Sequence, residues 1–332
     1  MNKILRYFIL VLILIISISC DEEFNLKGPL DDEYVFNCVL RGDTTTQYAT
    51  ITRSYDVANY NPVSNPVNPV VKGAKIKLIS NGKVYTMRDT VLPLTDPQYK
   101  TPVSCYYVNN LQLDIAQTIN AQVIMPDGKV LTATTKTVPT NDLKLQFEGS
   151  IPQKDTFGNY LDHVTLSWLF PSYIKDPYSA DIYYAPQLSI EYYKKENGNS
   201  IFMKKIIPDE YRVINDKLVP HYPDAGHTGL FTYDLNAITR ALNEISEGDD
   251  NKSNYIITRV VLTILMFDES LALYYSANQT FDNGLTLTLL PPDFSNVSGG
   301  KGIFGSYMKI ETSLLFRSFY IEPFGYQYTY SY

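Results

Sequence analysis

The chain has 332 residues, and its 28 Lys and Arg against 35 Asp and Glu give a net charge of −7. This length suffices for about two domains that each bury a sizeable core. Because the acidic balance repels phosphates, it excludes nucleic acid as a partner and a basic patch as the means of membrane attachment. The 28 tyrosines favour β-strands.

The N-terminus has the pattern of a secretory signal. Lys3 and Arg6 precede an apolar run that ends at Ile18, and a small residue stands directly before Cys20. The run is shorter than the roughly 20 residues that a membrane span requires. We therefore predict that residues 1–19 are a cleaved signal peptide. Its removal takes away two positive charges and changes the net charge from −7 to −9.

Cys20 then becomes the first residue of the mature chain. This arrangement resembles the bacterial lipobox, in which the cysteine is acylated with fatty acids such as palmitate and becomes the membrane anchor. Ser17 stands where the lipobox usually has Leu. Asp21, Glu22 and Glu23 resemble the signal that directs lipoproteins of Bacteroidota to the cell surface. We predict lipidation at Cys20 and a lipid-anchored, surface-exposed protein of the outer membrane.

Residues 20–30 form a short polar segment that contains Gly28-Pro29, as expected of a tether between the lipid and the folded part of the chain. From residue 31 onward, alternating apolar and polar residues predict strands, joined by turns such as Asn81-Gly82 and by a proline-rich loop at 59–69. The expected strands are 34–40, 47–53, 74–78, 84–87, 120–125 and 129–138. Their short spacing predicts an antiparallel β-sandwich, Ig-like or transthyretin-like, over residues 31–140.

Two cysteines remain in this part of the chain. Cys38 and Cys105 both lie inside strand-like runs, where a single cysteine behaves as a small buried apolar residue. An oxidising compartment would also permit a disulfide between them. Their spacing does not give their distance, so both interpretations stay open, and we favour buried thiols.

The second half, residues 141–332, is also predicted to be a β-sandwich, similar to a fibronectin type III domain with two short helices inserted. The strands are expected at 163–170, 183–195 and 255–267. Trp168 alternates with apolar neighbours and is expected in the core. Asp234 and Asp268 precede amphipathic stretches and are expected to cap the two helices.

Several segments resemble the DUF4249 lipoproteins of Bacteroidota. They are YVFNCVLRG, YATITRS, VKGAKIKLISNGKVY, INAQVIMPDGKVLTATTKTVP, FDESLALYYSANQTF and SNVSGGKGIFGSY. The chain departs from the family pattern at 290–294, where LPPDF replaces a single proline. The resemblance implies a surface or outer-membrane lipoprotein that works beside TonB-dependent transporters. It implies no known chemistry, because the function of the family is unknown.

Two motifs in the sequence indicate chemistry only weakly. His221, Asp224 and His227 could be zinc ligands, but the segment between the histidines is typical of a solvated turn, which we favour. Residues 300–305 match G-x-G-x-x-G but precede a strand-like pattern instead of a helix, so we expect glycines that permit a tight loop and no dinucleotide. No catalytic constellation is recognisable, and we predict a protein that is not an enzyme and has no cofactor.

The chain ends with four tyrosines at a period of two, namely Tyr326, Tyr328, Tyr330 and Tyr332. In an extended chain their rings line one face, which could bind a partner protein or a ligand such as a glycan or peptide. The alternative is a final strand that closes the C-terminal sandwich. In that case Phe316, Phe319 and Phe324 fill the core. We favour this interpretation for the phenylalanines and, by a smaller margin, for the tyrosines.

Two functions therefore stay open. The first is an accessory binding or interaction protein that assists TonB-dependent uptake of nutrients, with the membrane, a transporter and a glycan or peptide as partners. The second is a structural or adhesive component of the cell surface without a small-molecule ligand. A tyrosine-lined cleft between the two domains would favour the first function.

Overall fold

The computed structural model describes residues 33–54, 70–92, 103–114, 116–138, 143–169, 182–196, 198–282 and 294–329. The predicted signal peptide, Cys20, the acidic triplet after it, Tyr330 and Tyr332 lie outside these ranges. The described part is mainly β, with several antiparallel sheets and short helices, which confirms the predicted fold class.

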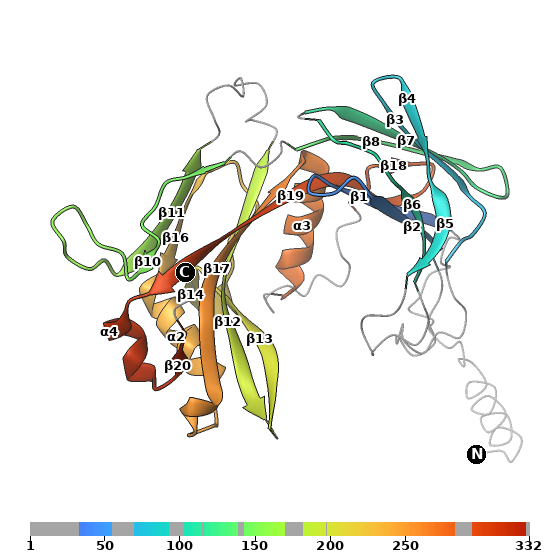
Figure 1. Ribbon diagram of the computed structural model, residues 1–332. Coiled ribbons are helices and arrows are strands. Elements are labelled where there is room, and N and C mark those ends of the chain that lie inside the picture. The colour runs from blue at the N-terminus through green and yellow to red at the C-terminus, as the bar shows by residue number, and fades with distance from the viewer. Residues whose placement is uncertain are drawn as a thin grey trace, which may run out of the picture.

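A large sheet runs through both halves of the molecule (Figure 1). In spatial order its main strands are β13 (Asn199–Ile207), β12 (Tyr183–Glu196), β17 (Tyr255–Phe267), β19 (Lys301–Phe316), β1 (Tyr34–Arg41), β2 (Gln47–Arg53), β6 (Val103–Val108) and β5 (Arg88–Leu92). Two short strands, β10 (Ser150–Ile151) and β20 (Gln327–Tyr328), pair with β19 and β17.

The N-terminal half is a β-sandwich, as predicted. Its second sheet contains β18 (Val297–Ser298), β8 (Val130–Lys136), β7 (Thr118–Ile124), β3 (Lys75–Ser80) and β4 (Lys83–Thr86). Residues along β1, β3 and β7 alternate between buried and more exposed, so one face of each strand enters the core. Phe36, Ile76 and Ile119 are among the side chains buried there.

The C-terminal segment completes this N-terminal sandwich. β1 pairs in parallel with β19 from Val35 opposite Lys301 to Arg41 opposite Tyr307, and β18 pairs with β8. Phe304 lies in the N-terminal core, 6.2 Å from Phe36 between ring centroids. Residues 31–140 therefore do not form this sandwich alone, and the predicted boundary at 140 does not separate two independent sets of strands.

In the C-terminal half, the core lies between the large sheet and a layer of small sheets and a helix. This layer contains β9 (Lys144–Leu145), β11 (His163–Leu169) and β16 (Leu230–Asp234), together with α2 (Leu235–Ile245). Trp168 is buried in this core, as predicted. The hairpin β14 (Glu210–Ile214) and β15 (Lys217–His221) forms a separate small sheet beside α2.

The two predicted helices and their caps are confirmed. Asp234 Oδ1 accepts a hydrogen bond from Asn236 N at 2.9 Å at the start of α2. Asp268 Oδ1 accepts one from Leu271 N at 3.1 Å at the start of α3 (Glu269–Asp282). The sequence did not predict the shorter helices η4 (Lys252–Asn254), α4 (Ser318–Ile321) and η5 (Glu322–Phe324). None of the helices in the described ranges has the length and apolar character to cross a membrane.

Cys38 and Cys105 are both buried free thiols, which confirms the favoured interpretation. Burial raises the pKa of the Cys38 thiol to about 12, so this side chain stays protonated at neutral pH. Burial also raises the pKa of Cys105. Neither thiol is therefore primed as a nucleophile, since the thiolate is the reactive form.

Candidate functional site

The tyrosines of the C-terminal tail that the structure describes are part of the core. Tyr326 is buried, and its hydroxyl bonds to Leu242 O at 2.5 Å and to Ser246 Oγ at 2.9 Å. The hydroxyl of Tyr328 accepts a hydrogen bond from Phe316 N at 3.0 Å. These two rings therefore do not line a free binding face, and the interpretation as a closing strand holds for them.

The cause is a change of chain direction just before the tail. η5 ends at Gly325, whose φ of 76° belongs to the left-handed region, and β20 then pairs in parallel with β17. Docking against β17 buries Tyr326 and fixes Tyr328, as in the alternative interpretation of a closing strand. Of the phenylalanines, Phe316 and Phe324 pack in or against this core as expected, but Phe319 is exposed.

The residues proposed as weak zinc ligands lie apart. His221 is the last residue of β15, whereas Gly226 bridges to Tyr184 and carries His227 toward β12. His227 Nδ1 lies 2.9 Å from Ile182 O, and Asp224 is exposed. The three side chains therefore do not come together as a group of ligands, in agreement with the favoured interpretation of this segment as a turn.

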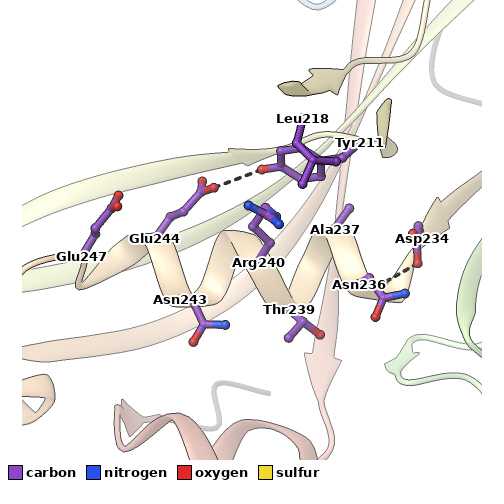
Figure 2. Close-up of a pocket in the computed structure, with 10 residues that line it drawn as sticks. All are labelled: Tyr211, Leu218, Asp234, Asn236, Ala237, Thr239, Arg240, Asn243, Glu244 and Glu247. Atoms are coloured by element: carbon purple, nitrogen blue, oxygen red, sulfur yellow. Dashed lines mark hydrogen bonds between the residues drawn. The ribbon is translucent and has the colours of Figure 1, made fainter. Parts of the chain in front are cut away.

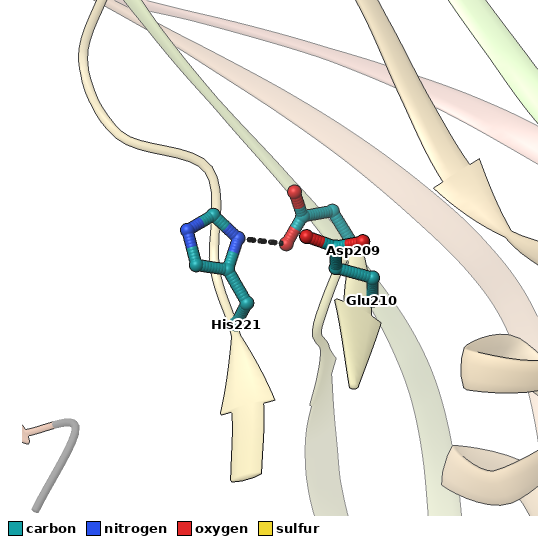
Figure 3. A group of neighbouring side chains, drawn as sticks. All are labelled: Asp209, Glu210 and His221. Carbon is teal, nitrogen blue, oxygen red and sulfur yellow. Dashed lines mark hydrogen bonds and ion pairs between the residues drawn. The ribbon is translucent and has the colours of Figure 1, made fainter. Parts of the chain in front are cut away.

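His221 instead meets two carboxylates that the sequence analysis missed. Its Nδ1 lies 2.8 Å from Asp209 Oδ1, and one donor atom each from Asp209, Glu210 and His221 lies within 4.8 Å of the others (Figure 3). Hairpin pairing places Glu210 directly opposite His221. Asn215 and Asp216 form the turn of this hairpin, and both have a positive φ. The Asn-Asp pair is the sequence signal that could have revealed the hairpin.

An acidic cavity of about 560 Å³ adjoins this group. Four carboxylates line it, and among its described lining residues there is no Lys or Arg; they are Asp162, His163, Asp209, Glu210, Thr232, Asp234 and Asn236. Burial raises the pKa of Asp209, against the opposing effect of its hydrogen bond with His221. The hydrogen bond from His163 lowers the pKa of Asp162. The cavity therefore favours cations.

A second cavity, of about 630 Å³, runs along α2 and meets the first at Asp234 and Asn236 (Figure 2). The Tyr211 hydroxyl donates to Glu244 Oε1 at 3.2 Å, and the Arg240 guanidinium lies 4.8 Å from the centre of the Tyr211 ring. Amide, hydroxyl and charged groups line this α2 groove, so it suits a polar ligand. It contains one tyrosine and lies within the C-terminal half, unlike the tyrosine-lined interdomain cleft considered above.

Three consecutive exposed apolar residues lie on β13, in its hairpin with β12. Ile201, Phe202 and Met203 are 45%, 52% and 40% exposed, and Tyr193 of β12 packs beside Phe202 with 5.7 Å between ring centroids. β13 is the terminal strand of the large sheet within the ranges that the structure describes. We call these four residues the β13 edge patch. The consecutive apolar residues Ile201, Phe202 and Met203 are the sequence signal that could have revealed this patch.

The G-x-G-x-x-G segment forms the first part of β19 from Lys301 onward, and not the predicted tight loop. It lies at the start of β19, beside β1, and no helix follows it. Gly302 has a φ of 121°, and a Cβ at this position would lie 2.0 Å from Phe36 O. Glycine therefore permits the close approach of β1 and β19.

Comparison with known proteins leaves the resemblance noted above as a prediction. No protein-family model matches the chain, and no curated protein matches it significantly.

Proposed function

We propose that this protein is a lipid-anchored outer-membrane protein at the cell surface that is not an enzyme and assists TonB-dependent uptake by binding the transporter. The signal-like N-terminus ending at Cys20 and the acidic residues after it support the location. The resemblance to DUF4249 lipoproteins supports the transporter as the partner. The structural observation that carries the proposal is the β13 edge patch.

The patch combines two properties of a protein-binding surface. A terminal strand offers backbone N–H and C=O groups to which an extended segment of another protein can pair. Ile201, Phe202 and Met203 lie on consecutive positions of β13, so they present apolar surface on both faces of the strand. Covering this surface stabilises a complex by about 25 cal/mol for each Å² removed from water.

The charged residues beside the patch favour a specific contact over non-specific hydrophobic association. The next two residues of β13 are Lys204 and Lys205, and Lys205 Nζ pairs with Glu244 Oε2 of α2 at 2.6 Å. Lysines beside an exposed strand oppose its pairing with a second copy of the same strand, since like charges repel. A different protein with a complementary strand is therefore the better occupant.

The experiment is affinity isolation of the lipidated protein from native membranes in mild detergent. We expect the wild-type protein to recover a TonB-dependent barrel and the double variant Ile201→Glu with Phe202→Glu to recover at least about tenfold less, since buried charges oppose docking. The matched control is Val213→Glu with Leu218→Glu, which changes exposed apolar residues of the β14–β15 hairpin and should leave recovery unchanged.

Equal recovery by both double variants would show that the patch does not bind the transporter. Recovery of the wild-type protein alone, at native abundance, would contradict the uptake function. A structural or adhesive role would then be the better explanation. Circular dichroism of both variants controls for folding, since the substituted side chains lie outside the buried cores.

A further inference from the structure

The group of Asp209, Glu210 and His221 has the composition of a metal site. We propose that these three side chains bind a divalent transition metal ion, with Zn²⁺ as the best fit. Imidazole nitrogen and carboxylate oxygen are ordinary zinc ligands, and three protein ligands leave a further position for water or a ligand. This inference is independent of the proposed transporter binding.

The backbone holds the donors in place from several sides. Asp209 N donates to His221 O at 3.0 Å, and Asp234 N donates to Asp209 O at 2.7 Å. These bonds join the start of β14, the end of β15 and the end of β16 around one point. Glu210 is fixed opposite His221 by the register of the hairpin. Glu210 and His221 thus lie on paired strands, and Asp209, directly before β14, is held by its two backbone hydrogen bonds.

The distances require little rearrangement. His221 Nδ1 and Asp209 Oδ1 are 2.8 Å apart. Two ligands that each lie about 2.0–2.2 Å from a tetrahedral zinc ion are separated by about 3.4 Å. A movement of roughly half an ångström at these two side chains therefore opens the space for the ion, and Glu210, within 4.8 Å, can supply the third bond.

The electrostatic surroundings favour a cation. Asp209 and His221 are mostly buried, with 20% and 19% of their side chains exposed. A charged carboxylate at such a site is costly unless a positive charge lies beside it. Asp162 and Asp234 line the same cavity and add negative charge, so a divalent ion would lower the electrostatic cost of the whole group.

One basic residue competes for the site. Arg212 Nε lies 2.6 Å from Glu210 Oε1, but both side chains are about half exposed. Exposed ion pairs contribute little to stability because water screens them. A divalent ion that is bound at the same time by Asp209 and His221 can therefore displace the guanidinium from Glu210.

The test is isothermal titration of the chelator-treated mature protein, residues 20–332, with ZnCl₂. We expect saturable binding of one ion by the wild-type protein, and at least tenfold weaker binding by His221→Ala and by Asp209→Asn. His227→Ala is the matched control and should bind like the wild type, since His227 lies outside the group. The visible absorption of Co²⁺ bound in place of Zn²⁺ reports the coordination geometry and provides a second measurement.

A folding control keeps the result decisive. If the variants at 209 or 221 lose their native circular dichroism, Glu210→Gln replaces them, because this half-exposed side chain can be changed without leaving a cavity. Absence of saturable Zn²⁺ binding to the wild-type protein would overturn the proposal. Binding of equal strength by His221→Ala and wild type, or by Glu210→Gln and wild type, would overturn it as well.

Discussion

Asp268 is the residue at which three elements of the structure are joined. Its carboxylate accepts hydrogen bonds from Thr135 Oγ1 of β8 at 2.6 Å, from Ser306 N of β19 at 3.0 Å and from Leu271 N of α3 at 3.1 Å. The side chain is buried, so loss of the acceptor leaves these donors without compensation from water. A helix cap thus also connects the N-terminal sandwich to the C-terminal half.

We predict that Asp268→Ala lowers the free energy of unfolding by more than about 2 kcal/mol, and that Asp268→Asn lowers it less.

Burial raises the pKa of Asp268 above its ordinary value of 3.8, despite the hydrogen bond from Thr135. The native state therefore holds this proton more tightly than the unfolded state. The protonation-linked part of the contribution of Asp268 to stability is therefore full below pH 3.8 and is lost as the pH rises through its pKa in the folded state, whereas its hydrogen bonds as an acceptor remain.

Urea denaturation from pH 3.8 upward, with the free energy of unfolding measured at each pH, tests the prediction. The wild-type protein should lose stability relative to Asp268→Asn as the pH increases, because asparagine does not titrate. Parallel stability profiles for the two proteins would show that the carboxyl group does not have a raised pKa in the folded state.

At the scale of elements, β19 is the strand on which both halves depend. Its first part pairs with β1 and its later part with β17, and Gly302 allows the close contact with β1. We predict that Gly302→Ala lowers the free energy of unfolding by at least about 2 kcal/mol, because the added Cβ would collide with Phe36 O at a strained φ.

Gly149→Ala is the matched control for this substitution. No atom lies within 4 Å of a Cβ at Gly149, and its φ is outside the positive region. We expect a change within about 0.5 kcal/mol in chemical denaturation. An equally small effect of Gly302→Ala would contradict the role assigned to this glycine.

Local patterns in the sequence predicted most elements because they depend on neighbouring residues. Alternation and turn residues identified the hairpin of β3 and β4, and capping aspartates identified α2 and α3. The period of two in the tyrosine tail also suggested a free aromatic face, which Tyr326 and Tyr328 do not form. η5 and Gly325 change the direction of the chain before the tail. Local patterns also do not contain the parallel pairing of β1 with β19, which joins residues more than 260 positions apart.

The candidate site was harder to predict than the fold for the same reason. His221 was identified as a candidate ligand, but its true neighbours, Asp209 and Glu210, are brought to it by the register of β14 and β15. The β13 edge patch depends on which strand ends the large sheet, and only the tertiary structure shows this.

At the scale of the whole molecule, the two halves share structure instead of following one another as separate units. The N-terminal core includes Val297 and Phe304, and β1 lies between β2 and β19 (Figure 1). We predict that a fragment of residues 31–140 does not fold alone, because it lacks β18, β19 and these core side chains. Thermal unfolding by circular dichroism should show no cooperative transition in the fragment and a clear one in residues 31–332. A cooperative transition in the fragment would contradict this prediction.

We propose that the anchored protein binds a transporter through the β13 edge patch. Site-specific photo-crosslinking in living cells tests it most directly, with a photoreactive phenylalanine analogue in place of Phe202 and, as control, of the exposed Val213. We predict a light-dependent adduct at position 202 that contains a TonB-dependent transporter, and no such adduct at position 213. Absence of the adduct at 202, or the same adduct at both positions, would contradict the claim.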